Sequence, residues 1–393
     1  MAVLLLPRGL DGATSVVDLE AALQRVAAGI QNWEDWSPEL KSRDSCNSPG
    51  RSGPAPARVR YFTRHTGTLW DWMCVAEALQ LNWDRQNPAR FNGYGIGVAA
   101  ADDVWRRNAS ALCGPDSDVL IHCDTVVDSR PALQNGCTKP IILQVTNRFD
   151  WKVHDRPAYI ELMRTAAANE RVFWVTNNPF EQLYMQGEGV TLPPSRHYML
   201  RPLGAAVLPG RPLGEGAARR FAVISKTHWR RHPDRDLLLP QIKKLGLEKM
   251  VEVYENHYGG PETLVSVMSQ YETLAAGGVL IVPSFPFFRT LRNRHHIGSS
   301  TLPLLTRAKR EGLNATKYME FYHPDFAPAM VYFTSWQHLG RIMRLPATDP
   351  MWEAKRAAGR RAMAAVRQAT LEGWQALMAH VAAAACKGPT GSA

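Results

Sequence analysis

Short, almost wholly apolar segments recur along most of this chain, separated by stretches with helical patterning. Examples are residues 118–124 ("DVLIHCD"), 140–147 ("PIILQVTN") and 279–284 ("VLIVPS"). Strands of this kind lack polar alternation because helices cover both of their faces, which is typical of mostly parallel sheets. The sequence therefore predicts an α/β protein, and 393 residues are too many for one typical core.

The strand–helix pattern runs through the chain twice. Strands are expected in the first half at 59–65, 118–124, 140–147, 171–177 and 197–204, and in the second half at 219–228, 250–256, 279–284 and 329–335. Helices are expected at 69–81, 156–169, 179–187, 235–246 and 263–278. Two such runs predict two Rossmann-like domains of the doubly wound type, with a cleft between them.

We expect four segments along the chain. Residues 1–57 hold an amphipathic helix at 14–32 and a linker at 37–57 that is rich in Ser, Pro and Gly. Residues 58–204 form the N-terminal Rossmann-like domain and residues 205–345 the C-terminal one. Residues 346–393 form an Ala-rich C-terminal helix.

Composition and charge limit the classes of partner that the chain is expected to bind. The formal net charge of +10 suits an anionic partner, but no RNA-binding signature, zinc finger or long basic run is present, which argues against nucleic acid. The six cysteines form no CxxC pair, so structural zinc is not expected, while one or two disulfides would fit a secreted chain. No apolar run is long enough to span a membrane, so the chain is expected to be soluble as written.

Ligands of doubly wound sheets bind outside the carboxyl ends of the strands, so the loops after each strand hold the candidate site residues. His65 follows the first strand and is a candidate general base, or simply part of a polar turn before a helix. Asn147, Arg148 and Asp150 follow the strand at 140–147 and would contact a sugar or acceptor, unless Arg148 and Asp150 form a structural pair. Asn178 is a sugar contact or a helix cap.

The second half adds a basic loop and one carboxylate. Lys226 and Arg230 follow its first strand and would neutralise a diphosphate, with a solvated basic loop as the alternative. Glu272 lies in the helix that Gly277 helps to end, and is either a surface residue or a ligand for a ribose diol. The segment "PSFPFF" after the strand at 279–284 is expected to be another ligand-facing loop.

The stretch "YETLAAGGVLIVPS" resembles the second-half signature of GT-B glycosyltransferases of the family 1-like group. The stretches "FNGYGIG", "ILQVTNRFDW", "VTNNPFEQLY", "HYMLRPLG" and "VYFTSW" are similar to a eukaryotic branch of these enzymes. The resemblance covers roughly residues 58–345 and implies that Glu272 holds the donor ribose, with Gly277 beside it. The family's upstream glutamate is replaced by Leu264, and the segment before Glu272 is short compared with the family pattern.

The resemblance implies glycosyl transfer from a nucleotide sugar to a hydroxyl of a glycan or protein acceptor. It implies no bound metal and no cofactor beyond the nucleotide-sugar co-substrate. The donor would contact Glu272, Lys226, Arg230 and Gly277, and the catalytic candidates are His65 and Asp150. Alternatives are a non-catalytic sugar- or nucleotide-binding relative, or another nucleotide-sugar enzyme such as an epimerase. The compartment stays open, with the Golgi lumen among the options.

Overall fold

The computed structural model describes residues 3–5, 58–91, 96–124, 126–205, 221–225, 234–255, 268–296 and 302–386. The chain divides into two compact units. One comprises residues 17–202 and 367–393 and is called the six-stranded unit; the other comprises residues 1–16 and 203–366 and is called the five-stranded unit. The segments 14–32 and 37–57, for which the sequence predicts a helix and a linker, lie outside the described residues.

The six-stranded unit is built on a wholly parallel sheet with the order β3-β2-β4-β5-β6-β7. Its strands are β2 (Arg58–Phe62), β3 (Asn82–Gln86), β4 (Val119–Cys123), β5 (Ile141–Val145), β6 (Val172–Thr176) and β7 (His197–Met199). Every residue of β4 and β6 is buried. The parallel sheet that the apolar runs predict is therefore confirmed.

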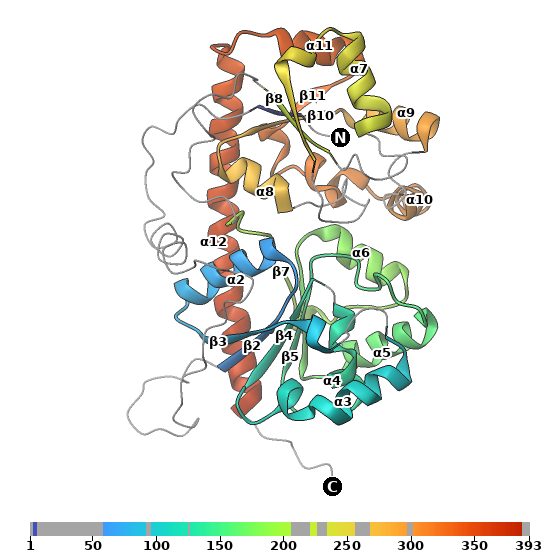
Figure 1. Cartoon of the computed structure of the whole chain (residues 1–393), viewed down its shortest axis with the longest axis vertical. Coiled ribbons are helices and arrows are strands. Elements are labelled where there is room, and N and C mark those ends of the chain that lie inside the picture. Colours follow the sequence, from blue (N-terminus) through green and yellow to red (C-terminus); the bar gives the residue numbers. More distant parts are fainter. Residues whose placement is uncertain are drawn as a thin grey trace. The chain divides into compact units, whose positions relative to one another are not determined.

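Helices lie on both faces of this sheet (Figure 1). They are α2 (Thr66–Ala78), α3 (Val98–Cys113), α4 (Arg130–Gln134), α5 (Arg156–Ala168), α6 (Pro179–Gly187) and the part of α12 (Pro350–Cys386) from residue 367 on, with short turns η1 (Pro88–Phe91), η2 (Val126–Ser129) and η3 (Pro194–Arg196).

Successive residues of each strand point to opposite faces of the sheet. Phe62, Leu143 and Trp174 belong to the core that also contains residues of α3 and α5. On the opposite face Tyr61 stacks on Trp72 of α2, with ring centroids 4.7 Å apart. Trp72 in turn meets Trp374 of α12 edge to face at 5.3 Å. Such aromatic pairs add to the burial energy and fix the two helices on the sheet.

The five-stranded unit has the strand order β11-β10-β1-β8-β9. Its strands are β1 (Val3–Leu5), β8 (Phe221–Ser225), β9 (Val251–Glu255), β10 (Val279–Pro283) and β11 (Val331–Phe333). Its helices are α7 (Leu239–Lys244), α8 (Met268–Ala275), α9 (Phe285–His295), α10 (Leu302–Glu311), α11 (Trp336–Arg344) and the first part of α12; its shorter turns are η4 (Asp234–Leu238), η5 (Glu248–Met250), η7 (Ala315–Tyr318), η8 (Glu320–Tyr322) and η9 (Ala327–Ala329).

Strand β10 is buried on both faces and joins two cores. Val279 and Ile281 pack with residues of α7 and α11, whereas Leu280 and Val282 pack with residues of α8 and α12. The alternation follows the pleat, which sends successive side chains to opposite faces. As in the six-stranded unit, helices therefore cover both sides of the strand.

Strand β1 is an unexpected member of this sheet. It lies between β8 and β10 and runs antiparallel to both, whereas β8 pairs with β9, and β10 with β11, in parallel. Leu4 is in register with Leu280 on one side and with Ala222 on the other. The N-terminal residues thus link two parallel strand pairs that do not contact each other directly in the sheet order.

Helix α9 replaces the loop expected at "PSFPFF". Its N-terminal boundary is Ser284, and Pro286 occupies the first turn, where a missing N–H costs nothing. Phe288 and Leu291 are buried one helical turn apart. The apolar residues of this segment therefore serve the core.

Replacing Leu4 with proline should destabilise the five-stranded unit. Strand β1 has a neighbour on each side, so proline removes an amide from the ladder and forces its ring into the sheet. We expect a loss of roughly 3 kcal/mol in the free energy of unfolding, measured by urea denaturation of the full chain. Leu4→Val is the control and should stay within about 1 kcal/mol of the parent. Equal stability of Leu4→Pro and Leu4→Val would show that β1 does not hold the sheet together.

Candidate functional site

The carboxyl edge of the six-stranded sheet has a topological switch point between β2 and β4. Strand β3 lies on one side of β2 and β4 on the other, so the loops that follow β2 and β4 diverge there. Crevices of this kind are where doubly wound sheets bind ligands. The loop after β2 carries Arg64 and His65, and the turn after β4 carries Asp124 and Asp128.

Asp128 is the most perturbed carboxyl group at this edge. Its side chain is 4% exposed, and neither carboxylate oxygen makes a hydrogen bond. Burial raises the pKa of Asp128 to about 7; Arg64, whose Nη2 lies 3.6 Å from Oδ1, opposes the shift, and Asp124 adds to it. A carboxyl group that titrates near neutrality can take up or release a proton under working conditions.

Sequence reasoning did not select Arg64 or Asp128. Their loops stood out only as segments after strands. The signal that would have found them is the pairing of β2 with β4. It brings Arg64, two residues after the end of β2, close to Asp128, five residues after the end of β4. That pairing cannot be read from either segment alone.

His65 is exposed and serves as the N-cap of α2. Its Nδ1 accepts a hydrogen bond from the backbone N–H of Thr68 at 3.3 Å. Thr68 Oγ1 donates back to the His65 carbonyl at 2.9 Å, and the His65 N–H donates to Thr63 Oγ1 at 3.2 Å. Because Nδ1 is the acceptor, the neutral ring carries its proton on Nε2 and presents a donor outward.

Arg148 pairs with Glu181, and not with Asp150. Its Nη1 donates to Glu181 Oε1, and its guanidinium lies 4.2 Å from the ring centroid of Phe180 and 5.1 Å from that of Tyr184. The Arg148 side chain is 11% exposed and that of Glu181 3%. Two rings and a carboxylate thus surround this guanidinium.

The two neighbours of Arg148 in the loop are also engaged. Asn147 Oδ1 accepts from the Arg148 N–H at 2.9 Å, a local turn contact. Asp150 accepts from Arg156 Nε at 2.8 Å and from the Tyr184 hydroxyl at 3.1 Å. The loop that carries Asn147, Arg148 and Asp150 therefore has a hydrogen bond at each of these residues, either within the loop or to a neighbouring helix.

Asn178 is fully buried at the N-cap of α6. Its Oδ1 accepts from the Glu181 N–H at 3.0 Å, and its Nδ2 donates to Asn177 Oδ1 at 2.5 Å. Pro179 occupies the first helical position. Asparagine before proline at a helix start is a strong capping pattern, and this accounts for the residue.

Glu272 lies on α8 in the five-stranded unit. Gln270, Tyr271 and Leu274 form the buried side of this helix, while Glu272 is half-buried. Since successive residues turn by about 100°, Glu272 points away from the middle of that buried side. Gly204, at φ +65°, approaches the same helix so closely that a Cβ there would lie 2.7 Å from the Tyr271 carbonyl oxygen.

Gly277 ends α8 in a Schellman motif. The Gly278 N–H donates to the Thr273 carbonyl at 2.8 Å, and the Gly277 N–H to the Leu274 carbonyl at 3.1 Å. Gly277 has φ +71°, a conformation that favours glycine. The glycine pair thus turns the chain from α8 directly into β10. Lys226 and Arg230 lie outside the described residues.

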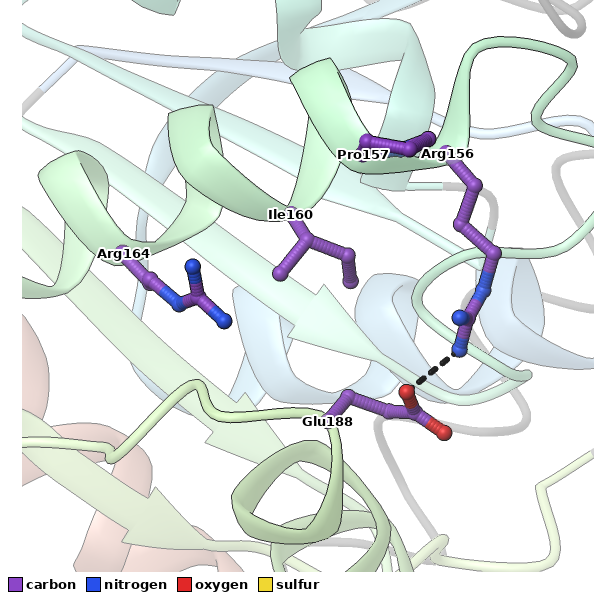
Figure 2. Close-up of a pocket in the computed structure, with 5 residues that line it drawn as sticks. All are labelled: Arg156, Pro157, Ile160, Arg164 and Glu188. Carbon is purple, nitrogen blue, oxygen red and sulfur yellow. Dashed lines mark ion pairs between the residues drawn. The ribbon is translucent and has the colours of Figure 1, made fainter.

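A surface pocket of about 450 Å³ lies beside the Asp150 loop, lined by Arg156, Pro157, Ile160, Arg164 and Glu188. Figure 2 shows Arg156 and Glu188 meeting at one end, where Arg156 Nη2 and Glu188 Oε2 are 2.6 Å apart. Arg164 Nη1 lies 3.0 Å from Glu161, and its Nε donates to the Gly189 carbonyl at 3.1 Å. The charged lining is thus internally paired, and no predicted site residue lines this pocket.

No group of three or more His, Cys, Asp or Glu side chains in the described ranges could hold a metal ion. No helix among those residues is both long and apolar enough to cross a membrane.

No protein-family model matches the sequence, and no curated protein matches it. Among solved structures, the chain is similar to the "glycotransferase of kitacinnamycin", with 11% sequence identity and a TM-score of 0.41. The alignment covers 83% of this chain and 100% of that chain.

Replacing Asp128 with asparagine should flatten the pH dependence of stability. The folded state raises the Asp128 pKa from 3.8 to about 7, so it binds more protons than the unfolded chain in that window. The free energy of unfolding then falls as pH rises through the window. The shift sets a ceiling of roughly 4 kcal/mol, at about 1.4 kcal/mol for each pKa unit.

The measurement is urea unfolding at about pH 4 and about pH 8 for the parent, Asp128→Asn and Asp116→Asn. Asp116 is a matched control on the same unit, with a side chain 72% exposed. Asp128→Asn should lose less stability than the parent between the two pH values, and Asp116→Asn should behave like the parent. The same pH dependence in all three proteins would contradict the buried, protonated Asp128.

Proposed function

We propose that this chain is a GT-B-type glycosyltransferase that moves a sugar from a nucleotide-sugar donor to a hydroxyl acceptor without a bound metal. The five-stranded unit would bind the donor and the six-stranded unit the acceptor. The proposal combines the resemblance of "YETLAAGGVLIVPS" to the GT-B signature with the local structure of that stretch. Both units also have the covered, mainly parallel sheets that a Rossmann-like domain requires.

The observation that carries the proposal is the placement of Glu272. It is a half-buried carboxylate on a helix whose other side is anchored in the core, and a short turn of residues 276–278 leads from this helix into a fully buried strand. A side chain there has a fixed base and is partly exposed to solvent. A carboxylate can accept two hydrogen bonds from the vicinal hydroxyls of a ribose. Gly277 and Gly278 would support this role by setting where α8 stops.

Charge neutralisation would come from Lys226 and Arg230 after β8. Departure of a nucleoside diphosphate leaves negative charge on its oxygens, and cationic side chains placed there lower the barrier. This is how the chain would work without a metal ion. Both residues remain proposals from the sequence.

The acceptor hydroxyl must lose a proton during transfer. His65 could take it only after releasing the Thr68 N–H, because its capping bond uses the Nδ1 lone pair. Asp128 is a second candidate base on the same unit, with a pKa of about 7 and a position beside the switch point. In the geometry described, Asp150 contributes by holding Arg156 and Tyr184 in place.

A non-catalytic nucleotide- or sugar-binding protein is the second candidate. The observation that favours it is that Arg148, Asp150 and Asn178 all have internal partners that explain them structurally. Donor binding through Glu272 would survive in such a protein, while turnover would not. Measuring both binding and transfer separates the two functions.

Replacing Glu272 with alanine should weaken nucleotide-sugar binding. Two hydrogen bonds to a charged acceptor at roughly 1.5 kcal/mol each would be lost, so we expect a rise in Kd of roughly a hundred-fold. Isothermal calorimetry with uridine and guanosine diphosphate sugars provides the measurement. Glu248→Ala is the matched control, an exposed glutamate on the same unit that should leave Kd unchanged.

Four outcomes are informative when thermal melting shows both variants folded. Weaker binding by Glu272→Ala alone supports the ribose contact. Unchanged affinity of Glu272→Ala rejects that role. Binding by the parent chain with no sugar released or transferred would favour the non-catalytic alternative, and no binding of any nucleotide sugar would overturn both functions.

A further inference from the structure

A disulfide joins Cys113, the last residue of α3, to Cys137, three residues after α4 ends, with 5.8 Å between the Cα atoms. That separation lies in the normal range for a disulfide. Cys137 is 7% exposed, so the bond is part of the core packing. Stable structural disulfides form in oxidising compartments and are rare where glutathione keeps thiols reduced. The bond therefore indicates that the six-stranded unit folds on the lumenal or extracellular side of a membrane.

The five-stranded unit carries an N-glycosylation acceptor sequence at residues 314–316, "NAT". Asn314 is exposed and follows the left-handed turn at Gly312 that ends α10. Its Oδ1 accepts from the Thr316 N–H at 3.1 Å and from Thr316 Oγ1 at 2.7 Å. Both of these bonds use the amide oxygen, and the residue is exposed, so the amide oxygen is held by the threonine.

We propose that Asn314 is an N-glycosylation site. The co-reactant is a lipid-linked oligosaccharide diphosphate, brought by the membrane-bound oligosaccharyltransferase of a eukaryotic secretory pathway. The Asn314 Nδ2 attacks the anomeric carbon of the first sugar, the bond from that carbon to the diphosphate oxygen breaks, and one Nδ2 proton is lost. The products are the glycosylated amide and the lipid diphosphate, with no change of oxidation state.

The Thr316 hydroxyl contacts the Asn314 amide in the folded chain, and a hydroxyl that donates to Oδ1 polarises the amide. An attached glycan would leave the Thr316 N–H bond to Oδ1 intact, because that bond uses the oxygen and the glycan is carried by Nδ2. Modification therefore breaks neither of these hydrogen bonds.

A second acceptor sequence, "NAS" at 108–110, provides an internal contrast. Asn108 lies at a kink inside α3, is half-buried, and donates from Nδ2 to the Val104 carbonyl at 3.0 Å. In the folded chain this amide nitrogen is therefore engaged in a hydrogen bond. Asn314, in an exposed turn, stays accessible throughout. We therefore expect a glycan on Asn314 and none on Asn108.

The inference does not rest on glycosyl transfer by this chain, because it uses only the disulfide and the acceptor sequence. It would place both units in an oxidising lumenal or extracellular compartment, because the disulfide lies in the six-stranded unit and the proposed glycan in the five-stranded unit.

The test begins with the full chain isolated from the cells that produce it. Digestion with a peptide N-glycosidase in heavy-oxygen water converts a glycosylated asparagine to labelled aspartate, which peptide mass spectrometry detects. The expected result is a labelled residue 314, an unlabelled residue 108, and a linked peptide pair containing Cys113 and Cys137. An intact disulfide with an unmodified Asn314 would overturn the proposal, as would free thiols at both cysteines with an unmodified Asn314.

Variants made by expressing the full chain through a eukaryotic secretory pathway sharpen the test. Thr316→Ala removes the hydroxyl but keeps the backbone bond that caps η7, so the chain should fold and lose one glycan-sized shift on gels. Thr316→Ser keeps a hydroxyl and should keep the shift. Ser110→Ala should change nothing. Loss of the shift in Ser110→Ala with retention in Thr316→Ala would place the glycan on Asn108 and reject Asn314.

Discussion

Complete burial of strands β4 and β6 is the constraint on which the six-stranded unit depends. Every residue of both strands is inside, so water is unavailable to their amides and carbonyls, which must pair within the sheet. Parallel pairing of that kind requires long crossover connections, and the helices that provide them cover both faces. In β4 and β6 the polar side chains are His122 and Thr176, which lie in the carboxyl halves of their strands, and further polar residues gather in the loops beyond. The location of the candidate site follows from this distribution before any particular residue is considered.

Polar residues at strand ends have two uses, and this chain shows both. His65 and Asn178 cap helices α2 and α6, and Arg148 forms an ion pair beneath two aromatic rings. These contacts turn the chain sharply after each strand and satisfy helix-terminal amides that would otherwise be unpaired. Asp128 is different, because its carboxylate is buried without a hydrogen bond and keeps its proton to about pH 7. A buried carboxyl group with a raised pKa and only an ion-pair contact to Arg64 is a stronger candidate for chemistry than a hydrogen-bonded helix cap.

Apolar patterning was sufficient to predict the parallel sheet, because a strand buried on both faces has an unmistakable composition. It failed where tertiary partners decide the outcome. Nothing local in residues 3–5 reveals that β1 will enter a sheet between β8 and β10, more than 200 positions away. The apolar run of α9 reads equally well as a loop until Phe288 and Leu291 are seen to be buried. At the site, one alternative from the sequence pairs Arg148 with the nearby Asp150, whereas in the structure Arg148 donates to Glu181. Sequence distance is a poor guide to side-chain contacts across neighbouring strands.

The proposed function requires that the α8–β10 corner of the five-stranded unit contacts a nucleotide. Hydrogen–deuterium exchange of the full chain, with and without a saturating nucleoside diphosphate, tests it most directly. A ligand held by Glu272 should slow exchange of the amides around α8 and its glycine cap, residues 268–278, because the helix end can no longer fray. Unchanged exchange in that segment, with calorimetry showing the nucleotide bound, would place the ligand elsewhere and contradict the account.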